Sequence, residues 1–194
     1  MLFGFNHYEG SVETMISANE YTERLLSEYS KTFDITKDYE IGGFKALAYG
    51  YFSTTSEKYV LNPKVNLWSI NGFEHILFFQ KDEVSTDDIE SYKRLMIDHM
   101  APELVCMNKS FPEKDHMYSY VTVAVICNNT PDPEALKAIK AFKYEKNYLL
   151  TIRGHVEGHL ILMDLSTGKA HTSKSCRHLS EFYERIIDDR STIA

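Results

Sequence analysis

The sequence predicts a single α+β domain in which a largely antiparallel sheet is flanked by about four helices. Its 194 residues suit one core, and the 43% hydrophobic and 25% charged residues are typical of a globular protein. Helical and strand-like apolar spacings alternate along the chain without a linker between its halves. We therefore treat residues 1–194 as one domain.

The first part of the chain combines a helix with a β-rich region. Apolar residues three and four apart predict an amphipathic helix over 12–29, with Ser11 as its N-cap. Aromatic residues are then frequent over 44–79, and Asn71-Gly72 favours a hairpin turn because both residues tolerate positive φ. We expect a three-stranded antiparallel meander in this region.

The middle of the chain carries strong capping patterns. Ser85 or Thr86, followed by two aspartates, predicts the start of a second helix, which we expect Ala101-Pro102 to end. The run 118–127 is almost continuously β-branched and aromatic, which predicts a central strand covered on both faces. Asp132 followed by Pro133 predicts the start of a third helix.

The last part of the chain predicts three more strands and a helix. Strands are expected over 148–152 and 158–165, and a tight turn over 166–168 leads to a short strand over 169–172. Apolar spacing of three and four then predicts a helix over 176–189.

The expected element order contains βββα twice, over about 44–101 and 148–189. An internal duplication therefore remains open, although no residue identity accompanies the shared order.

The last quarter of the chain resembles a known family. The residues are Tyr148-Leu-Leu-Thr-Ile-Arg-Gly154, then Asp164-Leu-Ser-Thr-Gly-Lys169, and then Arg177. They resemble the C-terminal part of an uncharacterised bacterial domain family. The resemblance implies a bacterial domain without an assigned activity and carries over no functional residue.

Charge and cysteine content limit the partners and the compartment. The net charge is −7 and no basic patch stands out, so we do not expect a nucleic-acid partner. No apolar run reaches the length of a membrane span, and the N-terminus lacks a secretion signal. The cysteines Cys106, Cys127 and Cys176 form no paired motif, which favours a reducing compartment. Together these observations predict a cytoplasmic location, and the missing span predicts no membrane partner.

Four ionisable residues share one phase of a predicted strand: Arg153, His155, Glu157 and His159. Two imidazoles and a carboxylate are ligands of several divalent-metal sites. However, residues four apart on a strand are about 13 Å apart, so only a neighbouring pair reaches one ion unless Gly158 forms a bulge. Ligands from outside would be needed, and the candidates are His171, Asp164 and His178. The alternative is a solvent-facing strand or a pairing of Arg153 with Glu157.

Two side chains are candidates for catalysis. Glu157 is the acidic member of the proposed metal site. Cys176 lies near the predicted start of the last helix beside Arg177 and His178, features that lower a thiol pKa. No nucleophile motif surrounds it, so an ordinary packing role is the alternative.

Aromatic residues gather in the predicted meander, including Tyr49, Tyr51 and Trp68. Together with Arg153 they are candidates for a ligand cleft or a protein interface. The alternative is that these rings fill the space between the sheet and the helices.

Two functional hypotheses follow. The first is a non-catalytic cytosolic binding or interaction domain with no cofactor, which binds a protein or a small molecule and leaves a homodimer open. The second is a small metal-dependent, hydrolase-like enzyme that uses His155, Glu157 and His159. The chain contains neither a dinucleotide-binding glycine motif nor a phosphate-binding loop motif.

Overall fold

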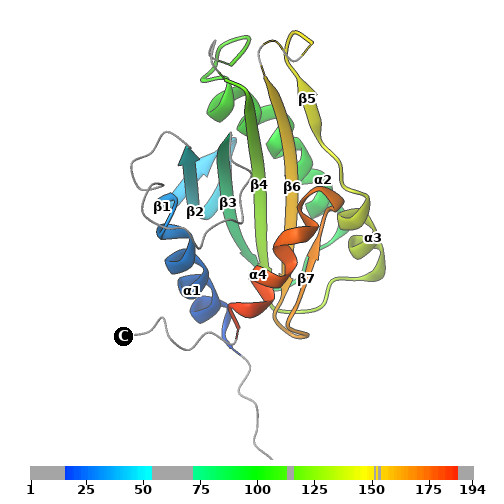
Figure 1. Cartoon of the computed structure of the whole chain (residues 1–194). Helices are drawn as coiled ribbons and strands as arrows, with labels where there is room; N and C mark the ends of the chain where they lie inside the picture. The colour runs from blue at the N-terminus through cyan, green and yellow to red at the C-terminus, as the bar shows by residue number, and fades with distance from the viewer. Residues whose placement is uncertain (1–15, 54–71, 113–115, 151, 153, 188–194) are drawn as a thin grey trace, which may run out of the picture.

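The computed structural model describes residues 16–53, 72–112, 116–150, 152 and 154–187. Within these residues, one sheet contains seven strands in the order β1-β2-β3-β4-β6-β5, and β7 also pairs with β6 (Figure 1). The strands are β1 (Asp34–Ile41), β2 (Phe44–Ser53), β3 (Phe73–Lys81), β4 (Tyr118–Cys127), β5 (Glu145–Asn147), β6 (His155–Asp164) and β7 (Lys169–Thr172).

The sheet is mostly antiparallel, as predicted, but its centre is parallel. The pairings β1–β2, β2–β3, β5–β6 and β6–β7 are antiparallel, whereas β3–β4 and β4–β6 are parallel. Parallel neighbours need a crossover connection. One crossover contains α2 (Thr86–Leu95) and the π-helix η2 (Met96–Val105), and the other contains α3 (Pro133–Ala141).

Two hydrophobic cores cover the two faces of the sheet. One lies against α2, η2 and α3, and we call that side the α2/α3 face. The other lies against α1 (Ala18–Ser30), the 3₁₀-helix η3 (Lys174–Leu179) and α4 (Ser180–Arg185), and we call it the α1/α4 face. The first halves of β4 and β6 extend past α1 and α4 in Figure 1. One end of the α1/α4 face is therefore uncovered by these helices.

The central strand β4 confirms the prediction for 118–127. It lies between β3 and β6. Val121, Val123 and Val125 belong to the core of the α2/α3 face, and Ala124 and Ile126 belong to the core of the α1/α4 face. This alternation is the geometry of a strand buried on both sides.

The first helix begins later than predicted, because Ser17 is its N-cap in place of Ser11. The Ser17 hydroxyl accepts a hydrogen bond from the Glu20 amide, at 3.2 Å. Residues 1–15, including Ser11, lie outside the described residues.

Strand β1 was not predicted. It pairs with β2 through the turn Gly42-Gly43, whose φ angles of 56° and 78° suit glycine. A Gly-Gly pair between strands is itself a hairpin pattern, so the sequence did contain this signal. β1, β2 and β3 form an antiparallel meander, but it differs from the predicted one, because β1 precedes the region 44–79. The predicted turn residue Asn71 and the strand expected before it lie outside the described residues.

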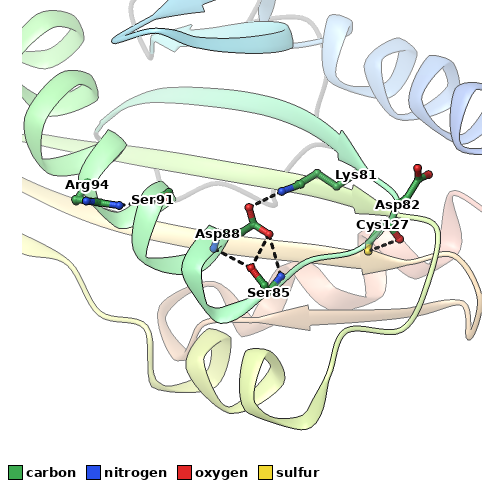
Figure 2. A network of polar contacts seen from close by, with 7 residues as sticks. All are labelled: Lys81, Asp82, Ser85, Asp88, Ser91, Arg94 and Cys127. Atoms are coloured by element: carbon green, nitrogen blue, oxygen red, sulfur yellow. Dashed lines mark hydrogen bonds and ion pairs between the residues drawn. The ribbon is translucent and has the colours of Figure 1, made fainter.

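The N-terminus of α2 is confirmed in atomic detail (Figure 2). The Ser85 hydroxyl accepts from the Asp88 amide at 3.3 Å, and the Asp88 carboxylate accepts from the Ser85 amide at 2.9 Å. This reciprocal pair is a capping box. Lys81 at the end of β3 also contacts the Asp88 carboxylate, which ties the helix start to the sheet.

The helix does not end at Pro102 as predicted. It continues as η2, a π-helix that contains Pro102, and the Cys106 amide donates to the Ala101 carbonyl five residues earlier at 3.0 Å. An α-helix would bring the proline ring against a carbonyl of the preceding turn, and wider π-helical turns relieve that collision. Met96 and Met100 are completely buried, so tertiary packing also holds this segment.

The start of α3 is confirmed, but the next predicted strand is wrong. The Asp132 carboxylate accepts from the Ala135 amide at 2.7 Å, with Pro133 at the first helical position. The strand expected over 148–152 is instead β5, which ends at Asn147. Leu149 and Leu150 follow with left-handed φ angles of 48° and 52°, which end the extended conformation.

The C-terminal region is close to the prediction as far as β7. The Gly168 turn, with φ of 68°, connects β6 and β7. The helix expected over 176–189 is shorter, because η3 contains a non-helical Cys176 and α4 runs only from Ser180 to Arg185. The duplication stays a prediction. Among the described helices, none has the length and apolar character needed to cross a bilayer.

Candidate ligand site on the sheet

The predicted ionisable residues of β6 do share one face. Ile161 and Met163, which continue the phase of the odd-numbered residues, belong to the core of the α1/α4 face. Val156 and Leu160 belong to the opposite core. His155, Glu157 and His159 therefore lie on the α1/α4 face, whereas Arg153 lies outside the described residues.

These three residues have separate surroundings. His155 Nδ1 shares a hydrogen bond of 2.8 Å with Asn147 Oδ1, and Glu157 accepts from the Tyr118 hydroxyl at 3.1 Å. Across the described residues, no group of three or more His, Cys, Asp or Glu side chains is arranged to hold a metal ion. The described residues therefore provide no assembled set of ligands that would support the metal hypothesis.

The suggested outside ligands are also dispersed. His171 pairs with Leu162, which places it on the α2/α3 face. Asp164 ends β6 and accepts hydrogen bonds from Thr130 at 2.7 Å and from the Ser166 amide at 2.9 Å. Of these three, exposed His178 is the one whose electrostatic effect lowers the pKa of His159.

Glu74 on β3 is the residue that the sequence analysis missed. It lies directly across from Tyr120, which in turn lies across from Glu157, so all three share the α1/α4 face. Glu74 is 1% exposed, and the Thr122 hydroxyl donates to its Oε1 at 2.7 Å. Burial raises the pKa of Glu74 to about 8, while the Thr122 hydrogen bond acts in the opposite direction. The carboxyl group is therefore mainly protonated at neutral pH.

His159 on β6 is the second buried polar group of this region. It lies across from Thr122, and its ring stacks on Tyr120 with centroids 4.4 Å apart. Burial lowers the pKa of His159 to about 3, and the charge of His178 acts in the same direction. The imidazole is therefore neutral at neutral pH.

Both groups have atoms without hydrogen-bond partners among the described residues. These atoms are Glu74 Oε2 and both ring nitrogens of His159. A buried polar atom without a partner costs about 1–3 kcal/mol, and such atoms are rare in folded proteins. We call the group formed by Glu74, Tyr120, Thr122 and His159 the Glu74–His159 site. Its polar atoms are suited to a partner that the described residues do not supply.

A row of rings leads from the uncovered end of the sheet to this site. Tyr118 stacks on His155 with centroids 5.6 Å apart, and it packs edge-on against Tyr120 at 4.4 Å. These rings and Glu157 are half-buried. The approach is therefore aromatic and polar, whereas the site itself is buried.

The sequence did contain a signal for Glu74. It is the one acidic residue in the stretch Phe73–Phe79, where only Glu74 and His75 are not apolar. An acidic residue is almost never fully buried without a partner, so its position in such a strand indicates a special role. Thr122 gave no comparable signal, because threonine is common in strands.

Cys176 does not have the environment predicted for a nucleophile. It is completely buried at the kink of η3, and its Sγ lies 3.2 Å from Ser173 Oγ. Burial raises the pKa of the thiol to about 11, although its hydrogen bonds with the Ser173 hydroxyl and with the Leu160 and Ser173 carbonyls act in the opposite direction. A nucleophilic cysteine requires a shift in the other direction.

The aromatic candidates lie on the other side of the sheet. Tyr51 pairs with His75, and the Tyr49 hydroxyl and His75 Nδ1 share a hydrogen bond of 2.7 Å. Tyr49 packs against the core of the α2/α3 face, which places this group opposite the Glu74–His159 site. Both tyrosines are half-buried, and Trp68 lies outside the described residues. Tyr49 and Tyr51 therefore do not share a face of the sheet with His155, Glu157 and His159.

A cavity of about 400 Å³ lies at the far end of the parallel strands. Ser17 at the start of α1, Gln80 on β3 and Asn128 after β4 form part of its wall. It is distinct from the Glu74–His159 site, which lies on the first halves of β4 and β6.

Fold and site together define a single α+β domain with a buried, incompletely paired polar group on one sheet face. The chain belongs to the family described as a domain of unknown function (DUF8052), whose model matches residues 17–185. The uncharacterised family predicted from the last quarter thus extends over most of the chain, whereas its bacterial origin stays a prediction. No curated protein and no solved structure matches the chain.

Proposed function

We propose that this protein is a non-catalytic binding domain that takes a small organic ligand at the Glu74–His159 site. One observation carries the proposal: Glu74 and His159 are buried beside Thr122 and retain unpaired polar atoms within the described residues. A ligand that pairs with these atoms would remove the cost of leaving them unsatisfied.

The surroundings favour an organic ligand. Tyr120 lies between Glu74 and Glu157 in the strand register, and Phe52 lies across from Glu74 on β2. Ligand sites commonly combine apolar and aromatic walls with a few polar groups that set the orientation. This composition matches that description.

Binding is better supported than catalysis. The burial of Cys176 raises its thiol pKa, and no metal-ligand group of three or more is present in the described residues. The alternative, a metal-dependent hydrolase-like enzyme using His155, Glu157 and His159, rests on their shared face alone. A cytosolic location remains part of the proposal, supported by the three free cysteines. A protein partner or a homodimer stays a prediction.

The test is a fragment screen of the full chain by NMR, with isotope-labelled protein and a chemically mixed set of small neutral and charged molecules. We expect the signals of Tyr120, Thr122 and His159 to shift together. Substitution His159→Phe should weaken the best fragment at least tenfold, which corresponds to about 1.4 kcal/mol.

His155→Phe is the matched control. His155 lies on the same strand and face but is half-buried and already pairs with Asn147. Its substitution should change the affinity less than threefold. Fragments that shift only residues of the Ser17–Asn128 cavity, or only Tyr49 and Tyr51, would contradict the proposal.

A further inference from the structure

Resting on this proposed function, we infer that the Glu74–His159 site takes an uncharged, planar ligand that carries a carbonyl oxygen beside an N–H group. Lactam rings and the hydrogen-bonding edges of nucleobases have this chemistry. The inference depends on which atoms of the site donate and which accept.

Glu74 supplies a hydrogen-bond donor. The Thr122 hydroxyl donates to Oε1, so the proton of the neutral carboxyl group is available on Oε2. A protonated carboxyl group donates through its O–H and still accepts through the remaining lone pairs. The free atom of Glu74 therefore matches a carbonyl oxygen of the ligand.

His159 supplies the complementary acceptor. A neutral imidazole has one N–H donor and one acceptor nitrogen, and neither nitrogen has a partner in the described residues. The acceptor nitrogen matches an N–H group of the ligand. Glu74 accepts a hydrogen bond from Thr122, and His159 lies across from Thr122 on the next strand, so we expect a ligand with both groups to lie over β4 between them.

The site disfavours charged ligands. Within the described residues, no Lys or Arg side chain pairs with Glu74, so a buried anion would lack a countercharge. A cation would have to ionise Glu74, which burial opposes. An uncharged ligand avoids both costs.

The flat surfaces of the site favour a planar ligand. Tyr120 and His159 stack with an angle of 29° between their rings, and Tyr118 stands at 86° to Tyr120. Planar rings pack well against such aromatic faces and edges.

Three ring compounds of similar size separate the ligand classes. The probes are 2-pyridone, an uncharged lactam; benzoate, an anion; and benzamidine, a cation. Each is titrated into the labelled full chain at pH 7, with the signals of Thr122 and His159 as the readout. We expect 2-pyridone to bind at least tenfold more tightly than either charged probe.

Two substitutions at one position test the donor role of Glu74. Glu74→Gln keeps an N–H donor and an oxygen acceptor, so the affinity for 2-pyridone should stay within about threefold. Glu74→Leu removes both and should weaken binding at least tenfold. The spectra of the two variants report whether each remains folded. If Glu74→Leu does not fold, the affinity of Glu74→Gln for 2-pyridone still shows whether the Glu74 carboxyl group is neutral or ionised.

The outcomes separate the two proposals. Preferred binding of benzamidine that is lost in Glu74→Gln, or preferred binding of benzoate, would overturn the ligand class but leave a binding site in place. If no probe shifts Thr122 or His159, the ligand class is overturned. If the mixed fragment set also leaves these residues unchanged, the proposed function fails with it.

Discussion

The two faces of the sheet each bury a histidine, but only one histidine is paired. On the α2/α3 face, His75 is 6% exposed and shares a hydrogen bond with the Tyr49 hydroxyl. On the α1/α4 face, His159 is 2% exposed, and neither ring nitrogen has a partner in the described residues. Burial lowers the pKa to about 4 for His75 and to about 3 for His159.

The difference separates a structural role from a functional one. A buried histidine with a hydrogen bond is a stable part of a core, whereas one without a partner costs free energy that the fold must offset. The α1/α4 face adds a second group of this kind in Glu74. The buried histidine of the α2/α3 face therefore has its partner within the fold, whereas Glu74 and His159 are suited to an external partner.

The largest expected effect is a loss of stability at alkaline pH that comes from Glu74. Its pKa is raised from 4.5 to about 8, so the folded state binds more protons than the unfolded state between these values. Stability from this group is complete below about pH 4.5 and falls by about 4 kcal/mol as the pH rises through 8. Urea unfolding from pH 5 to pH 8.5 measures this slope.

Glu74→Gln provides the control for this slope, because an amide does not titrate. The variant should lose most of the pH dependence above pH 5. An unchanged slope in Glu74→Gln would mean that Glu74 is ionised in the folded protein.

The next effect occurs at acid pH and involves both faces. The pKa values of His75 and His159 lie below the ordinary 6.5, so the unfolded state binds more protons as the pH falls. Each histidine should reduce the free energy of unfolding by about 3 kcal/mol between pH 6.5 and pH 4. His75→Phe and His159→Phe should each flatten that limb, as measured by urea unfolding at a series of pH values. If either variant loses as much unfolding free energy at acid pH as the original protein, the histidine replaced in it does not cause that loss.

At neutral pH the same two substitutions should have opposite signs. His159→Phe removes a buried group with unpaired nitrogens and keeps a flat ring on Tyr120, so stability should rise by about 1 kcal/mol. His75→Phe removes the partner of Tyr49, so stability should fall by about 1 kcal/mol. Thermal unfolding of both variants at pH 7 measures the contrast. Equal signs would remove the distinction between the faces.

The smallest effect compares two tyrosine hydroxyls. Tyr49→Phe leaves His75 Nδ1 buried without its partner and should cost about 1 kcal/mol. Tyr118→Phe removes a hydrogen bond to half-buried Glu157, which water can replace, and should cost less than about 0.5 kcal/mol. Chemical unfolding of the two variants measures both. A larger cost for Tyr118→Phe would mean that the hydrogen bond between Tyr118 and Glu157 stabilises the fold more than the partial exposure of both residues indicates.

The sequence predicted the residues of the candidate site that lie on β6, but not those on β3 and β4. The strand phase placed His155, Glu157 and His159 on one face, which the structure confirms. The prediction did not include Glu74 or Thr122, because their contact depends on the parallel pairing of β3 with β4. Segments separated by a long crossover carry no local mark of which strand they will join.

The sequence by itself determined the features that depend on neighbouring residues. The caps at Ser85 and Asp132 are examples, because a cap needs only a side chain and the amide three residues later. The buried strand β4 is another, since its composition suits only a position covered on both sides.

Only the tertiary structure decided the parallel centre of the sheet, the π-helical path through Pro102 and the protonation of Glu74 and His159. Each of these depends on atoms from distant segments. Strand order is set by how crossovers pack, and a pKa shift is set mainly by the water that other segments exclude. Glu74 and His159 become a candidate binding site because the fold buries them while Glu74 Oε2 and both ring nitrogens of His159 have no hydrogen-bond partner among the described residues.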